Sequence, residues 1–311
     1  MFEGRPKAAP VRPTAWEERW GSPVFRAFSP SLPPYPPRDP PPQLLPAESL
    51  AVPRLDGRGS LAATWYEAPG PARGAVLLLH PWLHWGKSYF YRGGRIEALR
   101  AAGYHALTLD FAGFGGSGPP HGLHDREVAA GLAKLRELAD GLPLHVWGVS
   151  SGGFWAHLVL SRTDFVAGAM FEDVSPHLLE WSWRVLPRWR PGYLFLRCSF
   201  PRVYRFLDLR RHAPALQVAA AAYVSGSEDL GVRPVDTRNL AERAGARHRI
   251  IRGAPHLAAI KIAGEEVIDL ALQTFASAER PHPAPAVPTA LGVPPGLPVA
   301  GRRAGTSRPA R

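Results

Sequence analysis

The chain has 311 residues, which is enough for one large α/β domain or two small ones. Apolar residues make up 45% of the sequence and support a substantial buried core, while the single cysteine, Cys198, excludes an internal disulfide and a cysteine-based zinc site. The formal net charge of +11 suggests a nucleic-acid partner, but the basic residues are concentrated in residues 174–214 and at the two ends. We therefore expect no nucleic-acid partner.

The sequence contains no obvious membrane or export signal. The first twenty residues mix charges with prolines and lack the apolar run of a secretory signal peptide. No stretch approaches the roughly eighteen consecutive apolar residues of a membrane-spanning helix. We expect a soluble, cytoplasmic protein.

Prolines crowd both ends of the chain. Proline lacks a backbone N–H and disrupts helix interiors and sheet ladders, so residues 1–48 and 281–311 are predicted to be extended or disordered. The remaining residues, 49–280, are predicted to form one folded domain.

Strand-like and helix-like segments alternate within residues 49–280. The first segment, 49–69, has the pattern of two strands joined by a glycine turn, and 74–80 ("GAVLLLH") that of a strand buried on both faces. The next segments in chain order are helix 88–103, strand 104–111, helix 125–141, strand 144–150, helix 151–162, strand 165–173, strand 216–226, helix 234–245, strand 248–253 and helix 264–280. This alternation predicts an α/β fold with a mostly parallel central sheet flanked by helices.

The stretch "LHVWGVSSGG" (144–153) places two serines between a strand and a helix. Gly148-Val149-Ser150-Ser151-Gly152 has the spacing G-x-S-x-G, in which the glycines allow a sharp turn that exposes the Ser150 hydroxyl. Ser151 does not fit as the nucleophile, because Val149 would then occupy the first glycine position. Ser150 as a simple helix cap remains an alternative.

A serine nucleophile needs a base, and the base needs an orienting acid. Asp229 follows strand 216–226 and His256 follows strand 248–253, which gives the chain order Ser150, Asp229, His256. Glu228 and Asp173 remain alternative acids. His80 also ends a strand, where we expect a structural hydrogen bond rather than catalysis.

Five segments, in this order, resemble the α/β-hydrolase fold superfamily, and in particular its serine-triad esterases and lipases: "GAVLLLHPW", "LDFAGFGGSG", "GVSSGG", "SGSEDLGVRP" and "GAPHLAAI". The resemblance implies Ser150 as nucleophile, His256 as base and Asp229 as acid, with no cofactor and no metal. It also implies an oxyanion hole built from the backbone N–H of Ser151 and one from the loop after the third strand.

Pro81 stands in that loop where relatives usually have glycine, and proline has no N–H to donate. The second donor is therefore expected to be Trp82, with Leu83 as the fallback.

Residues 174–214 interrupt the fold where the family carries its cap. The segment has eight aromatic residues, and eight arginines against Glu180 and Asp208, interleaved as in short helices with one apolar and one basic face. One interpretation is an inserted helical cap packed on the body with solvated arginines. The other is a lid that lines an acyl pocket and whose basic side meets anionic lipid or an acidic substrate.

These observations predict a serine hydrolase that cleaves carboxylic esters or related acyl compounds through an acyl-enzyme, with a small-molecule substrate that carries an apolar acyl group. An acyltransferase would use the same triad and remains an alternative. The other alternative is a non-catalytic protein that binds a ligand or a membrane surface on the same fold.

Overall fold

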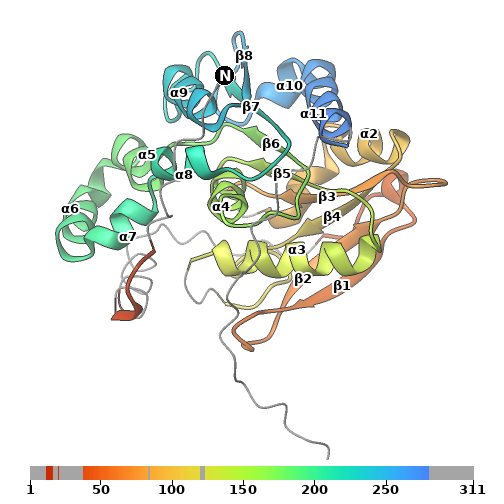
Figure 1. Ribbon diagram of the computed structural model, residues 1–311, viewed down its shortest axis with the longest axis horizontal. Coiled ribbons are helices and arrows are strands. Elements are labelled where there is room, and N and C mark those ends of the chain that lie inside the picture. The colour runs from red at the N-terminus through yellow and green to blue at the C-terminus, as the bar shows by residue number, and fades with distance from the viewer. Residues whose placement is uncertain (1–11, 17–19, 21–37, 83–84, 120–122, 280–311) are drawn as a thin grey trace, which may run out of the picture. The chain divides into compact units, whose positions relative to one another are not determined.

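The computed structural model describes residues 12–16, 20, 38–82, 85–119 and 123–279 (Figure 1). The chain divides into two units, Met1–Arg280 and Pro281–Arg311, and all described residues belong to the first. The predicted tail 281–311 and most of the predicted N-terminal segment 1–48 lie outside the described residues.

A central sheet of eight strands organises the first unit, in the order β1-β2-β4-β3-β5-β6-β7-β8. The first two strands pair antiparallel and the other six are parallel, which confirms the predicted mostly parallel sheet. The strands are β1 (Glu48–Pro53), β2 (Ser60–Tyr66), β3 (Gly74–Leu79), β4 (Tyr104–Leu109), β5 (Leu144–Val149), β6 (Gly168–Glu172), β7 (Ala220–Gly226) and β8 (Arg247–Ile251).

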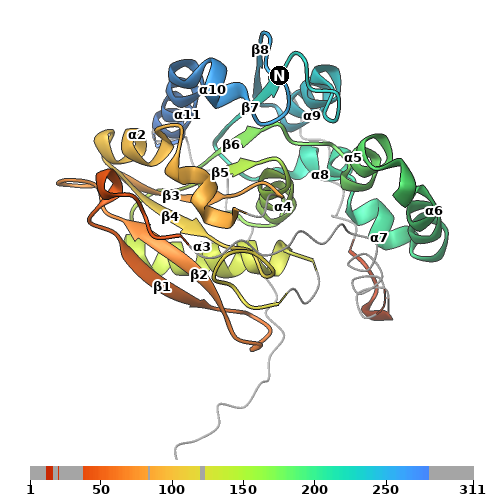
Figure 2. The same ribbon diagram turned by 180° about the vertical axis from the view of Figure 1, so that it is seen from behind.

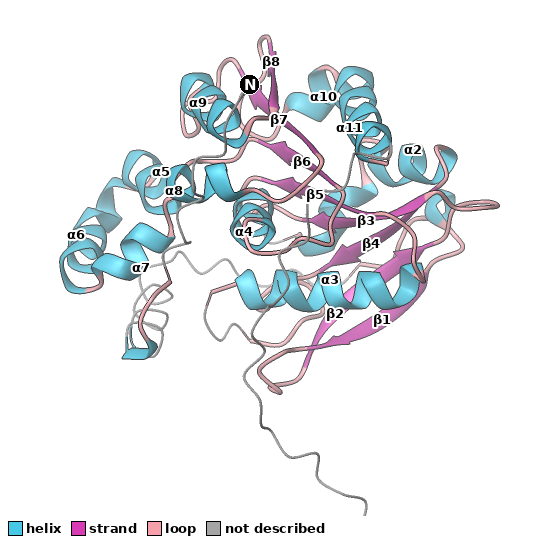
Figure 3. Cartoon of the chain, viewed as in Figure 1, coloured by secondary structure: helices cyan, strands magenta, loops and turns pink. Residues whose placement is uncertain are grey.

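Helices cover both faces of this sheet, so it forms the central layer of three (Figure 3). Side chains that alternate along β3 separate into two apolar cores: Leu77 and Leu79 pack on one face, and Val76 and Leu78 on the other. Helices α3 (Asp125–Ala139), α4 (Ser151–Leu160) and α9 (Pro234–Ala244) close the first core, and α2 (Arg95–Ala101), α10 (Ala259–Ile262) and α11 (Gly264–Ala278) close the second.

The predicted helix 88–103 is wrong in its first half. A 3₁₀ helix, η2 (Gly86–Tyr91), stands there, and α2 begins only at Arg95. Gly93 and Gly94 between them have φ angles of 81° and 70°, a left-handed conformation that a continuous α-helix cannot contain.

Four helices connect β6 to β7 within the segment 174–214, which we call the helical insertion. They lie beside the sheet in both views (Figures 1 and 2). They are α5 (Leu178–Val185), α6 (Arg190–Ser199), α7 (Pro201–Phe206) and α8 (Leu209–His212), with short 3₁₀ helices η3 (Pro187–Trp189) and η4 (Ala213–Ala215). None of the helices in the described part of the chain is long and apolar enough to cross a membrane.

Candidate active site

Ser150 lies on a strained turn between β5 and α4. Its φ of 49° and ψ of −115° fall outside the regions that side-chain-bearing residues ordinarily occupy. Its N–H donates to the carbonyl of Glu172 at 2.7 Å, and its carbonyl accepts from the N–H of Phe154 at 2.9 Å. Bonds on both sides therefore hold the turn in a conformation that costs energy, as expected for a nucleophile elbow.

Glycines around Ser150 are required by close backbone contacts. A Cβ on Gly148 would lie 2.4 Å from the Cα of Gly153, and a Cβ on Gly152 would lie 2.2 Å from the carbonyl oxygen of Leu79. These neighbours are backbone atoms that cannot rotate away. The G-x-S-x-G spacing thus has a steric cause in this fold.

His256 comes to Ser150 from the loop after β8. Its Nε2 lies 3.1 Å from the Oγ of Ser150, which is hydrogen-bond distance. The next residue, Leu257, has a φ of 64°, so the loop turns sharply just after the imidazole. The arrangement allows the imidazole to take the hydroxyl proton.

Asp229 forms a hydrogen bond with the other ring nitrogen of His256. Its Oδ2 lies 2.6 Å from Nδ1 of His256, and its Oδ1 accepts the N–H groups of Gly231 and Val232 at 2.9 and 2.7 Å. The neighbouring Glu228 has an exposed side chain and makes no contact with His256. Of the three acids considered from the sequence, Asp229 is the one that hydrogen-bonds the imidazole.

Asp173 lies beside Asp229 and His256, with a carboxylate oxygen within 4.8 Å of both side chains. Its buried carboxylate accepts the N–H of Gly226 at 3.2 Å and that of Leu257 at 2.7 Å. Burial, together with the negative charges of Asp229 and Glu172, raises the pKa of Asp173 to about 6. Asp173 thus ties the histidine loop to the end of β7.

Two carboxylates act on the pKa of His256. Burial alone would lower that pKa, but the hydrogen bond and charge of Asp229 and the charge of Asp173 raise it above the usual value of 6.5. The imidazolium that forms after proton transfer is therefore stabilised.

Asp173, Asp229 and His256 also place possible metal ligands within 4.8 Å of one another. All four carboxylate oxygens already accept N–H groups, from backbone amides or from the imidazole. A cation there would face those N–H dipoles, so the cluster fits hydrogen bonding and does not fit a metal.

A largely apolar pocket of about 140 Å³ opens onto Ser150 and His256. Both predicted oxyanion residues, Trp82 and Ser151, line it. Neither of their N–H groups donates to another described residue, and Ser151 begins α4, where helical N–H groups have no internal partner. The fallback residue Leu83 lies outside the described residues.

His80 steadies the loop that carries Trp82. Its Nδ1 lies 2.8 Å from the carbonyl of Pro81, and its Nε2 accepts the N–H of Phe111 at 3.1 Å. Burial lowers the pKa of His80, which keeps the ring neutral in this pattern of bonds. It is placed as a structural link between the ends of β3 and β4.

Sequence reasoning did not single out the rest of the pocket lining. Leu178 and Trp181, three residues apart on α5, bring the helical insertion to the pocket. Their spacing on one helix face was the available signal. The remaining lining residues are Pro81, Phe154, Ser175 and Leu257.

Comparisons with known proteins agree with this topology. The family model for the α/β-hydrolase fold matches residues 74–195. No curated protein sequence matches the chain.

Solved structures are similar at low sequence identity. An esterase of Pyrococcus furiosus is 18% identical with a TM-score of 0.64, over 79% of this chain and 96% of that one. A puromycin-hydrolysing peptidase of Mycobacterium tuberculosis is 17% identical with a TM-score of 0.57, over 75% of this chain and 39% of that one. An α/β-hydrolase of a Penicillium species, GrgF, is 16% identical with a TM-score of 0.57, over 76% and 99%. At these identities the likeness shows the fold alone.

Proposed function

Since this chain belongs to the α/β-hydrolase fold superfamily, we propose that it is a serine hydrolase that cleaves carboxylic esters or related acyl compounds. One observation carries the proposal: an unbroken hydrogen-bond chain from the Oγ of Ser150 through His256 to Asp229, at the floor of an apolar pocket. This is the arrangement that makes a serine hydroxyl nucleophilic.

The first half-reaction forms an acyl-enzyme. His256 Nε2 takes the Ser150 proton while Oγ attacks the carbonyl carbon, and Asp229 stabilises the imidazolium. The N–H groups of Ser151 and Trp82 stabilise the oxyanion, at about 3–4 kcal/mol per donor. His256 then gives its proton to the departing alcohol, and the acyl group stays on Ser150.

The second half-reaction hydrolyses the acyl-enzyme and regenerates the free enzyme. His256 removes a proton from water, the hydroxide attacks the acyl carbon, and the bond to Oγ breaks as the imidazolium returns the proton to Ser150. The products are a carboxylic acid and the free enzyme. An acceptor alcohol in place of water would make the same site an acyltransferase.

Pocket size supports a short acyl group. An apolar cavity of about 150 Å³ in another protein holds a benzene molecule, so a pocket of similar volume suits an acyl group of roughly six heavy atoms. The lining side chains Phe154, Leu178 and Trp181 favour an apolar acyl chain. Among the described residues, no acidic or basic side chain other than that of His256 lines the pocket.

A fluorophosphonate probe tests the proposal. We expect covalent labelling at Ser150, found by peptide mapping, that disappears in Ser150→Ala and persists in Ser151→Ala, because the second variant keeps its backbone N–H. Hydrolysis of a series of p-nitrophenyl esters should favour the short acyl chains. Folded protein that is neither labelled nor active on any ester would overturn the hydrolase and leave a ligand-binding protein.

A further inference from the structure

The outer side of the helical insertion exposes large apolar side chains. Trp183 on α5 is 38% exposed, and Leu194 and Phe195 on α6 are 50% and 48% exposed. The two helices pack against each other, and the rings of Trp183 and Tyr193 lie 6.3 Å apart. Figures 1 and 2 both show α6 on the side of the insertion away from the sheet. Apolar groups of this size gathered on adjacent helices indicate a binding surface.

Arginines are interleaved with these apolar groups. Arg190, Leu194 and Arg197 are at positions i, i+4 and i+7 of α6, which places them along one side of the helix. The guanidinium of Arg190 lies 5.2 Å from the ring centre of Trp183, so charge and aromatic surface are in direct contact. We call this surface, made of α5 and α6 with their exposed apolar and arginine side chains, the α5–α6 face.

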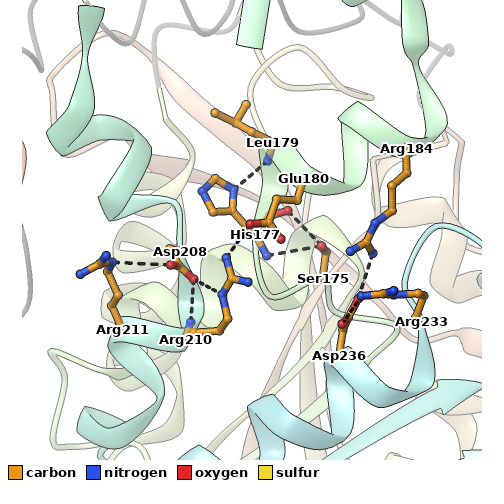
Figure 4. A network of polar contacts seen from close by, with 10 residues as sticks. All are labelled: Ser175, His177, Leu179, Glu180, Arg184, Asp208, Arg210, Arg211, Arg233 and Asp236. Atoms are coloured by element: carbon orange, nitrogen blue, oxygen red, sulfur yellow. Dashed lines mark hydrogen bonds and ion pairs between the residues drawn. The ribbon is translucent and has the colours of Figure 1, made fainter. Parts of the chain in front are cut away.

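The acidic residues near this face are already paired with other arginines. Figure 4 shows Asp236 contacted by Arg184 and Arg233. It also shows Arg210 held between Asp208 and Glu180. Among the described residues of the helical insertion, four exposed arginines have no ion pair with a carboxylate: Arg188, Arg190, Arg197 and Arg205.

We propose that the α5–α6 face docks the protein onto an anionic lipid bilayer, with Leu194 and Phe195 entering the boundary between headgroups and acyl chains and the arginines contacting lipid phosphates. Apolar side chains flanked by cations on one helix are what such an interface binds. Guanidinium groups suit this role, because their planar fork matches a phosphate.

Two other occupants fit the face less well. A two-fold contact with a second copy would bring the unpaired arginines of both copies together, which is repulsive. A nucleic acid would use the arginines but would leave Leu194 exposed to water. A bilayer surface satisfies both kinds of side chain.

In the docked protein, helix α5 would lie between the bilayer and the pocket. The inner side of that helix carries Leu178 and Trp181, which line the pocket beside Ser150, and its outer side carries Trp183. The docking proposal itself does not rest on the hydrolase activity, because binding can be measured with Ser150→Ala protein.

The single cysteine of the chain allows a fluorescent label to be attached at one defined position for this test. This residue, Cys198, is exposed on α6, four residues after Leu194 and three after Phe195, so it lies on the same side of the helix. The full chain labelled there with nitrobenzoxadiazole is mixed with vesicles of equal parts phosphatidylglycerol and phosphatidylcholine. We expect a blue shift and rise in emission with these vesicles, weakened between about 0.1 M and about 1 M salt, and little change with phosphatidylcholine alone.

Two double variants probe the two components separately. Arg190→Glu with Arg197→Glu, and Leu194→Ser with Phe195→Ser, should each weaken vesicle binding by more than about tenfold. Matched controls change an exposed apolar and an exposed basic residue in the β1–β2 turn: Leu55→Ser and Arg58→Glu should bind as the parent does.

Three results would overturn the proposal. The first is vesicle binding that is absent, or that neither double variant reduces. The second is tighter, variant-sensitive binding to a DNA duplex than to vesicles. The third is a dimer in sedimentation experiments that both double variants dissociate.

Discussion

The Nε2 of His256 lies 3.1 Å from the Oγ of Ser150, although 106 residues separate them along the chain. The loops after β5 and β8 bring them together, because the carboxyl ends of parallel strands meet at one edge of the sheet. Asp229, after β7, completes the chain of hydrogen bonds from the strand beside β8.

Replacing Asp229 with asparagine should nearly abolish turnover. The amide cannot stabilise an imidazolium and favours the wrong tautomer of His256, so we expect kcat/KM on a short-chain ester to fall by about 10³–10⁴. Glu228→Gln is the matched control, since it changes the adjacent exposed acid and should stay within about threefold of the parent. A large loss in Glu228→Gln with little loss in Asp229→Asn would reverse the assignment.

Replacing Asp173 with asparagine should move the acid limb of the pH–rate profile to lower pH. Catalysis needs neutral His256, so activity falls as pH drops through the pKa of that imidazole. The charge of Asp173 raises the pKa of His256, and removing it lowers that pKa, so the variant keeps activity further into acid. Because the pKa of Asp173 is itself about 6, the effect requires a pH at which this carboxylate is ionised.

The pH profile of kcat/KM is measured for Asp173→Asn and for Asp164→Asn. Asp164 is an exposed acid in the turn before β6, at the opposite end of the sheet from Ser150. Its replacement should leave the profile in place. An acid limb that does not move in Asp173→Asn would show that the charge of Asp173 has no effect on His256.

Adding a methyl group at Gly152 should disrupt the elbow. The new Cβ would lie 2.2 Å from the carbonyl oxygen of Leu79 and 2.6 Å from that of His80, both backbone atoms. We expect Gly152→Ala to lose at least about 2 kcal/mol of unfolding free energy, measured in urea, and to lose esterase activity. Gly118→Ala, where a Cβ meets nothing within 4 Å, should match the parent in both measurements.

Sequence patterns predicted the sheet and the three side chains that meet at its edge, because strand ends and their order can be read from the alternation of segments. They favoured Asp229 as the acid and kept Glu228 and Asp173 as alternatives, because all three follow strands and only the hydrogen-bond partner of His256 separates them. The break at Gly93 and Gly94 was missed because apolar residues on either side continue a helical pattern.

The orientation of the helical insertion could not be predicted from spacing. Trp181 and Trp183 are two residues apart on α5, yet the first lines the pocket and the second faces solvent. Both residues are tryptophans, so the sequence does not indicate which of them faces the pocket. Only the packing of α5 beside the pocket distinguishes them.

Replacing Trp181 with alanine should widen the acyl pocket. Its ring lies 6.3 Å from that of His256, so the space it fills is next to the reacting group. We expect kcat/KM for octanoyl relative to butyryl p-nitrophenyl esters to rise at least about tenfold, because one or two extra methylenes alone change such ratios by this much. Trp183→Ala, on the outer side of the same helix, should leave the ratio unchanged. An unchanged ratio in both variants would place the acyl group elsewhere.

Removing Arg95 should destabilise the strand that supports Ser150. Its guanidinium pairs with Glu172 at 2.7 and 3.0 Å, and Trp147 donates to the same carboxylate at 2.5 Å, with both charged side chains only 1% exposed. Arg95→Met would leave a buried, uncompensated carboxylate, so we expect a loss of about 3–5 kcal/mol in urea unfolding.

Adding Glu172→Leu to Arg95→Met should restore part of that stability, because the double variant no longer buries the uncompensated carboxylate of Glu172. The exposed pair of Arg233 and Asp236 is the matched control, and Arg233→Ala should cost at most about 1 kcal/mol. The backbone carbonyl of Glu172 accepts the N–H of Ser150, so a shift of this residue in Arg95→Met should disturb the nucleophile turn and lower kcat even at temperatures where the variant is fully folded. A variant as stable and active as Arg233→Ala would show that the buried ion pair does not support the nucleophile turn.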